Sequence, residues 1–298
     1  MSKLPAHLQH LTESLPAGKK AEIEEAILSS PLLQQRMTEE AQAGRLQHVR
    51  LQSSGEHSGG HYSRTDRSMY MDPDSFTELT TKTKRLDRIT YVLGHETAHS
   101  ALSEGSAVSS KALSDAVHGA LWTESDLGHL DLTAPAGRYL QYARQDESMA
   151  TIAAWNALAD RIDNERPGPL SKKDLLDRVA AIGDCVIGPE NNRQLAPGIT
   201  LNAQQRIMIG TPLTESANLE AVGVCYYDKP AQETKLGRNG DSDYANHYGA
   251  AVIENIAANV RSFETTTGQR APQIGLVLDQ LGLKRAQLEN NVLDLAGC

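Results

Sequence analysis

Apolar residues recur at a spacing of three or four in several parts of the chain, and this spacing predicts helices. At the first of them, Ser30 and Pro31 are typical of a helix start, and Gly44 is placed to end the helix. A polar stretch over residues 106–131 has only weak helical periodicity. The predicted helices cover residues 30–44, 84–103, 136–162, 244–263 and 273–295.

Short runs bounded by Gly, Ser and Asp lie between the first two predicted helices and predict the strands of a small sheet. These strands cover residues 46–52, 61–64 and 68–72, and one more strand is expected at 221–227. Helices and a small sheet together indicate an α+β fold. The Pro-Gly-Pro sequence at residues 167–169 is the strongest break between predicted elements. We therefore expect a core over residues 1–165 and a helical, loop-rich part over 166–298 that closes its cleft within one compact unit.

Composition narrows the class of partner. The 298 residues carry 29 basic and 38 acidic side chains, a net charge of −9, and no run of Lys and Arg that could follow a phosphate backbone. Nucleic acid is therefore not an expected partner. No apolar run approaches the roughly 20 residues that span a bilayer. The N-terminus lacks the apolar segment of a signal peptide, so we expect synthesis in the cytoplasm and, if the protein leaves, a route that reads no such signal.

The sequence contains three cysteines, too few for a zinc knuckle built on cysteine. Cys185 and Cys225 could form a disulfide in an oxidising compartment, but we expect buried free thiols.

The motif with the clearest chemistry is His-Glu-x-x-His, formed by His95, Glu96 and His99 within the second predicted helix. Residues four apart lie on the same helix face, so both imidazoles can bind one metal ion at about 2.0–2.1 Å. Glu96 is rotated away from the metal but can reach a water molecule bound to it. This arrangement predicts a zinc metallopeptidase in which Glu96 takes a proton from water and passes it to the leaving amine.

The spacing of these residues resembles the gluzincin branch of the zincin metallopeptidases, over roughly residues 20–165. The resemblance implies a zincin-like α+β fold and a third zinc ligand, a glutamate from a second helix. Glu147 fits this role because small apolar residues surround it and a buried carboxylate needs a partner. Asp146 is a candidate partner for a ligating histidine. Other candidates for the third ligand are Glu124 and the pair His129 and Asp131.

More loosely, the order of elements resembles zinc-peptidase effector domains delivered by bacterial secretion systems. In such folds the strand before the active-site helix forms the sheet edge and pairs with an extended peptide, and residues 68–72 match that position. The resemblance also implies a delivery protein and a cognate inhibitor as partners.

Zincins often supply a Tyr or His to stabilise the oxyanion of the intermediate. Tyr244, His247 and Tyr248, at the start of a predicted helix, are the candidates, with capping and packing as the alternative roles. His57 and His61, in a glycine-rich turn, could line the cleft or lie in a solvated turn.

Together these features predict a zinc-dependent peptidase acting on a protein or peptide, and the looser resemblance implies an effector toxin. Two other classes stay open. One is a zinc amidase that acts on cell-wall peptides, and the other is a non-catalytic binding module with structural zinc, which would need four protein ligands.

Overall fold

The computed structural model describes residues 3–53, 59–77, 79–123, 128–165, 168–210, 216–237 and 240–291. It confirms a mixed α+β protein, about 63% helical with small sheets. The described residues form two compact units, and both contain segments from two separate parts of the chain. Unit 1 comprises residues 1–103 and 147–226, and unit 2 comprises residues 104–146 and 227–298. This division runs through two long helices and does not coincide with the break at residues 167–169.

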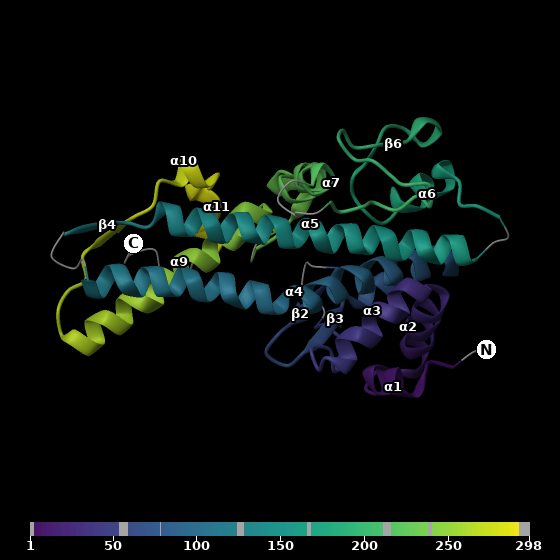
Figure 1. The fold of residues 1–298 in the computed structure, drawn as a ribbon, viewed down its shortest axis with the longest axis horizontal. Helices are drawn as coiled ribbons and strands as arrows, with labels where there is room; N and C mark the ends of the chain where they lie inside the picture. The colour runs from purple at the N-terminus through teal and green to yellow at the C-terminus, as the bar shows by residue number, and fades with distance from the viewer. Residues whose placement is uncertain are drawn as a thin grey trace. The chain divides into compact units, whose positions relative to one another are not determined.

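Unit 1 contains the predicted motif and the sheet whose strands β2 and β3 are labelled in Figure 1. Its helices are α1 (Ala6–Gln9), η1 (His10–Thr12), α2 (Ala17–Ser29), α3 (Pro31–Gln42), η2 (Pro73–Phe76), the first half of α4 (Lys82–Thr123), the second half of α5 (Thr133–Asn164), α6 (Lys172–Val179), η4 (Glu190–Asn192), α7 (Ala217–Val222) and most of the π-helical turn η6 (Gly223–Tyr227). Its strands are β1 (His48–Leu51), β2 (Gly60–Ser63), β3 (Ser68–Met71), β5 (Val186–Ile187) and β6 (Gln194–Leu195).

Helix α3 begins as its sequence predicts. Ser30 is the N-cap and its side chain accepts a hydrogen bond from the Leu33 amide, while Pro31 occupies the first turn. The chain leaves the helix through Gly44, whose φ of +70° a glycine adopts without strain.

The three-stranded sheet has the order β1-β3-β2, with β1 parallel and β2 antiparallel to β3. The predicted strands are confirmed, but the expectation that residues 68–72 form the edge is wrong. Strand β3 is central because β1 and β2 pair with its two sides. Strand β2 therefore lies at an edge of this sheet. Strand order depends on pairing between segments, which the pattern within one segment does not encode.

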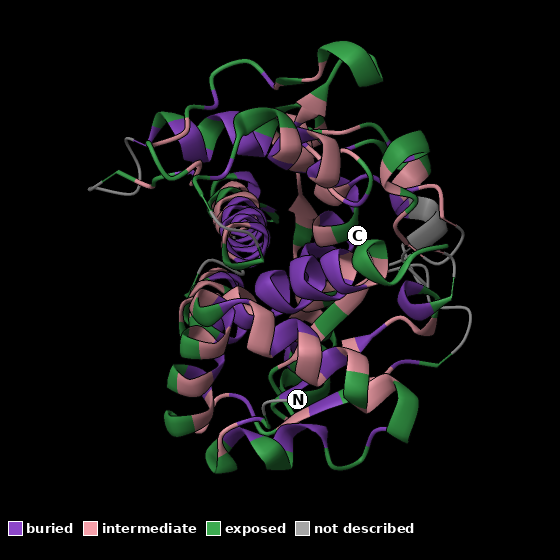
Figure 2. Ribbon diagram, turned by 90° about the vertical axis from the view of Figure 1, so that its right-hand side faces the viewer, coloured by how far each residue is buried: buried purple, intermediate pink, exposed green. Residues whose placement is uncertain are grey.

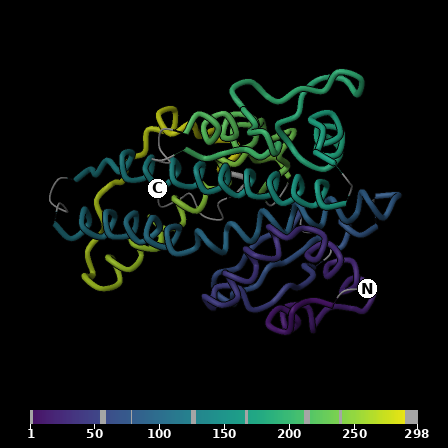
Figure 3. The backbone as a smooth tube through the Cα atoms, turned by 45° about the vertical axis from the view of Figure 1, so that its right-hand side comes forward, coloured from purple at the N-terminus to yellow at the C-terminus, as the bar shows by residue number. Residues whose placement is uncertain are grey.

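Two apolar clusters cover opposite sides of α4 in unit 1. The first joins the N-terminal helices and the sheet to α4, through residues such as Leu8, Met69 and Leu93. The second joins Tyr91 of α4 to α5, α6 and α7, with Trp155 buried among them. Figure 2 shows buried residues in purple along the helical ribbons, and Figure 3 shows the purple N-terminal segment beside the blue segment that follows it. The first half of α4 is therefore enclosed on two sides.

Unit 2 has its own apolar cluster, to which α4 contributes Leu113, Val117 and Leu121. Its other elements are the first half of α5, β4 (His129–Asp131), α8 (Ala231–Thr234), α9 (Tyr244–Thr267), β7 (Gln273–Gly275), α10 (Leu278–Leu281) and α11 (Arg285–Asn291). The prediction that α4 ends near residue 103 is wrong. Small, polar residues after this point weaken the apolar stripe, which resumes at a spacing of four.

Two further predictions are wrong. The strand expected at residues 221–227 is the end of α7 and the π-helical turn η6, because Ser216 caps a helix through the Leu219 amide. A short apolar run fits a buried strand and a buried helix equally. The helix expected over residues 273–295 is divided into β7, α10 and α11, since β7 pairs with β4 and Gly282 ends α10 with a φ of +68°.

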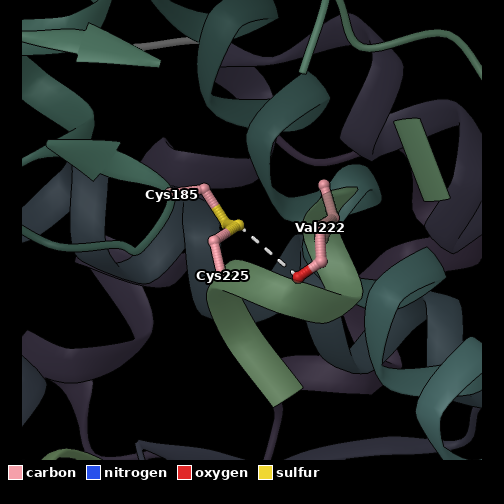
Figure 4. Close-up of a disulfide and its surroundings, with 3 residues drawn as sticks. All are labelled: Cys185, Val222 and Cys225. Carbon is pink, nitrogen blue, oxygen red and sulfur yellow. Dashed lines mark hydrogen bonds between the residues drawn. A yellow bond between two sulfur atoms is a disulfide. The ribbon is translucent and has the colours of Figure 1, made fainter. Parts of the chain in front are cut away.

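Cys185 and Cys225 form a disulfide across 40 residues, so the expectation of free thiols is wrong (Figure 4). Their Cα atoms lie 5.2 Å apart, within the range that a disulfide spans. Among the described helices, none is long and apolar enough to cross a membrane.

Candidate metal centre

The centre depends on a close approach between α4 and α5. A Cβ atom added at Gly94 would lie 2.9 Å from the Ala157 Cβ atom and 3.0 Å from the Ala154 Cα atom. The absence of a side chain at Gly94, together with the small residues on α5, therefore lets the two backbones pack closely. The sequence indicated the small face of α5, but the matching role of Gly94 was missed.

His95, His99 and Glu147 come together in unit 1 as the sequence predicted. The Nε2 atoms of His95 and His99 are 3.0 Å apart. The Glu147 Oε2 atom lies 3.3 Å from the His95 Nε2 atom and 3.6 Å from the His99 Nε2 atom. Ligands bound tetrahedrally at 2.0–2.1 Å are about 3.3–3.4 Å from one another. The three side chains, of which only His99 is partly exposed, could hold a metal ion.

The two carboxylates at the centre have pKa values shifted in opposite directions. Burial alone would raise the pKa of Glu147, but the charge of His99 and hydrogen bonds from both imidazoles lower it far below its ordinary value. Burial raises the pKa of Glu96, an effect that the two imidazoles oppose and the Glu147 carboxylate increases. Glu147 is thus suited to remain ionised as a ligand, whereas Glu96 is the better proton acceptor.

The Glu96 side chain extends from α4 toward the sheet, and the residue is only 4% exposed. Its Oε2 atom has no hydrogen-bond partner among the described residues. Strand β2 lies beside it, since a Cβ atom added at Gly60 would be 3.6 Å from the Glu96 Oε1 atom. A buried carboxylate oxygen without a partner is costly unless a ligand or water completes its contacts. The geometry therefore leaves one oxygen of Glu96 available for chemistry.

Tyr226 is a neighbour of the centre that the sequence analysis missed. Its ring centroid lies 5.7 Å from that of His95, at an interplanar angle of 51°. It follows Cys225 in η6, the turn wrongly expected to be a strand. The adjacent cysteine was a signal, but only the pairing with Cys185 shows where this turn lies.

The alternative third ligands do not join this group. Asp131 is exposed in unit 2, where its carboxylate accepts a hydrogen bond of 2.8 Å from the Thr133 amide at the start of α5. His129 is exposed in the same strand. Glu124 lies outside the described residues, as does His57. His61 is exposed on β2 and stacks on Tyr70, with ring centroids 4.8 Å apart.

The candidates for oxyanion stabilisation belong to unit 2. Tyr244 and Tyr248 both stack near Tyr227, with ring centroids 5.4 Å and 6.2 Å away, and His247 is exposed. Their catalytic role stays a prediction. Asp146 is buried in unit 2, and its role as a partner of a ligating histidine stays a prediction as well.

Searches of protein-family models, curated proteins and solved structures find no match to this chain. Its function must therefore be inferred from the centre itself.

Proposed function

We propose that this chain is a metallopeptidase that hydrolyses peptide bonds with one zinc ion. The observation that carries the proposal is the triangle of His95, His99 and Glu147, with sides of 3.0, 3.3 and 3.6 Å. Two imidazoles and one carboxylate are a ligand set typical of catalytic zinc, which uses three protein ligands and keeps one position open. Among the described residues the group has three members, which favours a catalytic site over a closed structural one.

A bound zinc ion would polarise the scissile carbonyl group and lower the pKa of water toward about 7. Glu96 takes the proton from the attacking water, whose oxygen bonds to the carbonyl carbon. Glu96 then gives this proton to the amine nitrogen as the carbon–nitrogen bond breaks. The raised pKa of Glu96 suits both steps, because it brings the carboxyl closer to neutral pH, where proton transfer is most effective.

The substrate would add a strand to the edge of β2. This strand lies at the sheet edge and passes Glu96 at Gly60, whereas β3 has neighbours on both sides. An extended peptide paired with β2 would place its backbone beside the proton acceptor. This assignment replaces the edge that the sequence predicted at residues 68–72.

A zinc amidase that cleaves cell-wall peptides uses the same chemistry, so the centre alone does not separate the two substrates. Parallel digestion of casein and of peptidoglycan would do so. Soluble peptides released from casein alone would support a protein substrate.

The decisive test replaces Glu96 by Gln. The variant keeps both imidazoles and Glu147, so we expect it to bind zinc as the wild type does. Loss of the proton acceptor should reduce hydrolysis about 10²–10⁴-fold. His95→Ala should lose both zinc and activity. Zinc content is measured by mass spectrometry and turnover by release of peptides.

Glu104→Gln is the matched control, because Glu104 is an exposed glutamate on the same helix. It should have the zinc content and activity of the wild type. Full turnover by the Glu96→Gln variant would refute the mechanism, and a wild-type protein without zinc would refute the metal centre.

A further inference from the structure

The disulfide lies one residue away from the ring that contacts the metal centre. Cys225 and Tyr226 are consecutive residues of the π-helical turn η6, and Tyr226 packs against His95. The partner cysteine, Cys185, comes from the segment before β5 (Figure 4). The disulfide thus restrains the backbone that carries Tyr226.

The other end of the disulfide is fixed to α4. A Cβ atom added at Gly183 would lie 2.9 Å from two ring carbons of Tyr91, so the segment before Cys185 packs directly on that ring. Arg88 donates a hydrogen bond of 2.9 Å to the Ile182 carbonyl. Tyr91 precedes His95 by one helical turn. The disulfide is therefore connected to α4 at two places. The segment before Cys185 packs on Tyr91, and the residue after Cys225 packs on His95.

The conformation of η6 needs such a restraint. A π-helical turn is rarely adopted without a specific cause, and it often occurs at functional sites. Conversion to α-helical hydrogen bonding would rotate the following side chains and move the Tyr226 ring relative to His95. The disulfide opposes this change by holding Cys225 next to Cys185.

We propose that the Cys185–Cys225 disulfide holds Tyr226 against the imidazole of His95, so that the centre binds its metal tightly in the oxidised chain and weakly in the reduced one. Tyr226 is a positioning residue, which acts by fixing the orientation of a ligand. This inference rests on the proposed metal centre, but it does not require hydrolysis.

The switch is a thiol–disulfide exchange. A dithiol reductant breaks the sulfur–sulfur bond, supplies two electrons and two protons, and becomes a disulfide itself. Cys185 and Cys225 are left as thiols. A reducing compartment would then hold the protein in its weakly binding form, and an oxidising one would restore tight binding.

The test measures Zn²⁺ affinity by competition with a chromophoric chelator, and ligand geometry by the visible absorption of bound Co²⁺. All variants carry Cys298→Ser, so that only Cys185 and Cys225 remain as cysteines. Replacing both by Ser should weaken Zn²⁺ binding about 10-fold, the lower end of the usual effect of losing a residue that orients a ligand. The Co²⁺ spectrum should shift as well.

Tyr226 variants separate ring position from fold stability, because they keep the disulfide. Tyr226→Ala should weaken Zn²⁺ binding as much as loss of the disulfide does, whereas Tyr226→Phe keeps the ring and should bind as the parent does. Combining Tyr226→Ala with the two Ser substitutions should cause no further loss, since both act through one contact. Val224→Ala is the matched control, because Val224 lies in the same turn and is 57% exposed.

Each outcome decides a separate point. Absence of Zn²⁺ binding in the oxidised parent would refute the metal centre and with it the proposed function. Equal affinity in the parent and the double Ser variant would overturn this inference alone. If the double variant does not fold and Tyr226→Ala binds as the parent does, the inference fails as well.

Discussion

Two groups of buried charges lie between α4 and α5 in unit 1, and they are balanced in different ways. In the first, Asp87 of α4 accepts a hydrogen bond of 3.1 Å from Arg161 of α5 and one of 2.7 Å from Arg178 of α6. The side chains of Asp87 and Arg161 are each 3% exposed. In the second, Glu147 and Glu96 face two imidazoles.

The difference lies in where the positive charge comes from. The guanidinium groups that neutralise Asp87 are permanent cations supplied by the chain. An imidazole must give up its proton to bind a metal, so His95 and His99 neutralise a carboxylate or bind a metal, but not both at once. The first group is therefore complete in itself, whereas the second is suited to a cation from solution.

The largest effect should come from breaking the first group. Asp87→Ala removes the buried carboxylate that pairs with Arg161, which then keeps only the partly exposed Glu165 as an ionic partner. Loss of one member of a buried ion pair costs about 3–5 kcal/mol. Urea denaturation would measure the change in the free energy of unfolding. Lys111→Ala is the control, because Lys111 pairs with Asp115 on the surface and should cost less than about 0.5 kcal/mol. A loss of that small size at Asp87 would contradict the comparison.

A smaller effect should come from filling the second group. Zinc at 100 times its dissociation constant should raise the free energy of unfolding by about 2.7 kcal/mol, because it binds only the folded chain. Thermal denaturation with zinc and with a chelator would show this gain. It should vanish in Glu147→Ala and persist in Asp87→Ala. A gain that survives in Glu147→Ala would show that zinc binds elsewhere.

The smallest effect should come from the helix contact that both groups share. Gly94→Ala introduces a Cβ atom into a packed contact and should cost about 1–3 kcal/mol, and it should also weaken zinc binding by separating the ligands. Gly119→Ala is the matched control on the same helix. Apart from its chain neighbours and the backbone of its own helix, no heavy atom of the described residues lies within 4 Å of the added carbon. There the better helix former should stabilise the chain by about 0.5–1 kcal/mol. Unchanged zinc affinity in Gly94→Ala would mean that the close approach is not needed for the centre.

The sequence correctly predicted the structural features that depend on residues close together along the chain. The cap at Ser30, the strands of the first sheet and the histidine spacing on α4 each act within one element, and the structure confirms them. Glu147 was predicted as well, because a carboxylate on a small apolar face needs a partner. Each of these features is determined by residues that are close together in the sequence.

Features that depend on distant segments were missed or wrongly predicted. Strand β7 exists because it pairs with β4, which is far away in sequence. The central place of β3, the disulfide and the contact of Tyr226 with His95 are likewise properties of pairs. Gly94 is one of several glycines in a helix, and its role becomes visible only beside Ala157.

Cys185 and Cys225, which are 40 positions apart in the sequence, close a covalent loop. A protease that cut this loop once, for example near the exposed Met208, would leave both fragments in a single molecule until a reductant separated them. Tyr226 would remain linked through sulfur to the polypeptide that contains His95, His99 and Glu147. A nicked chain could thus keep its centre intact in oxidising surroundings and release the fragment that carries Tyr226 in reducing ones.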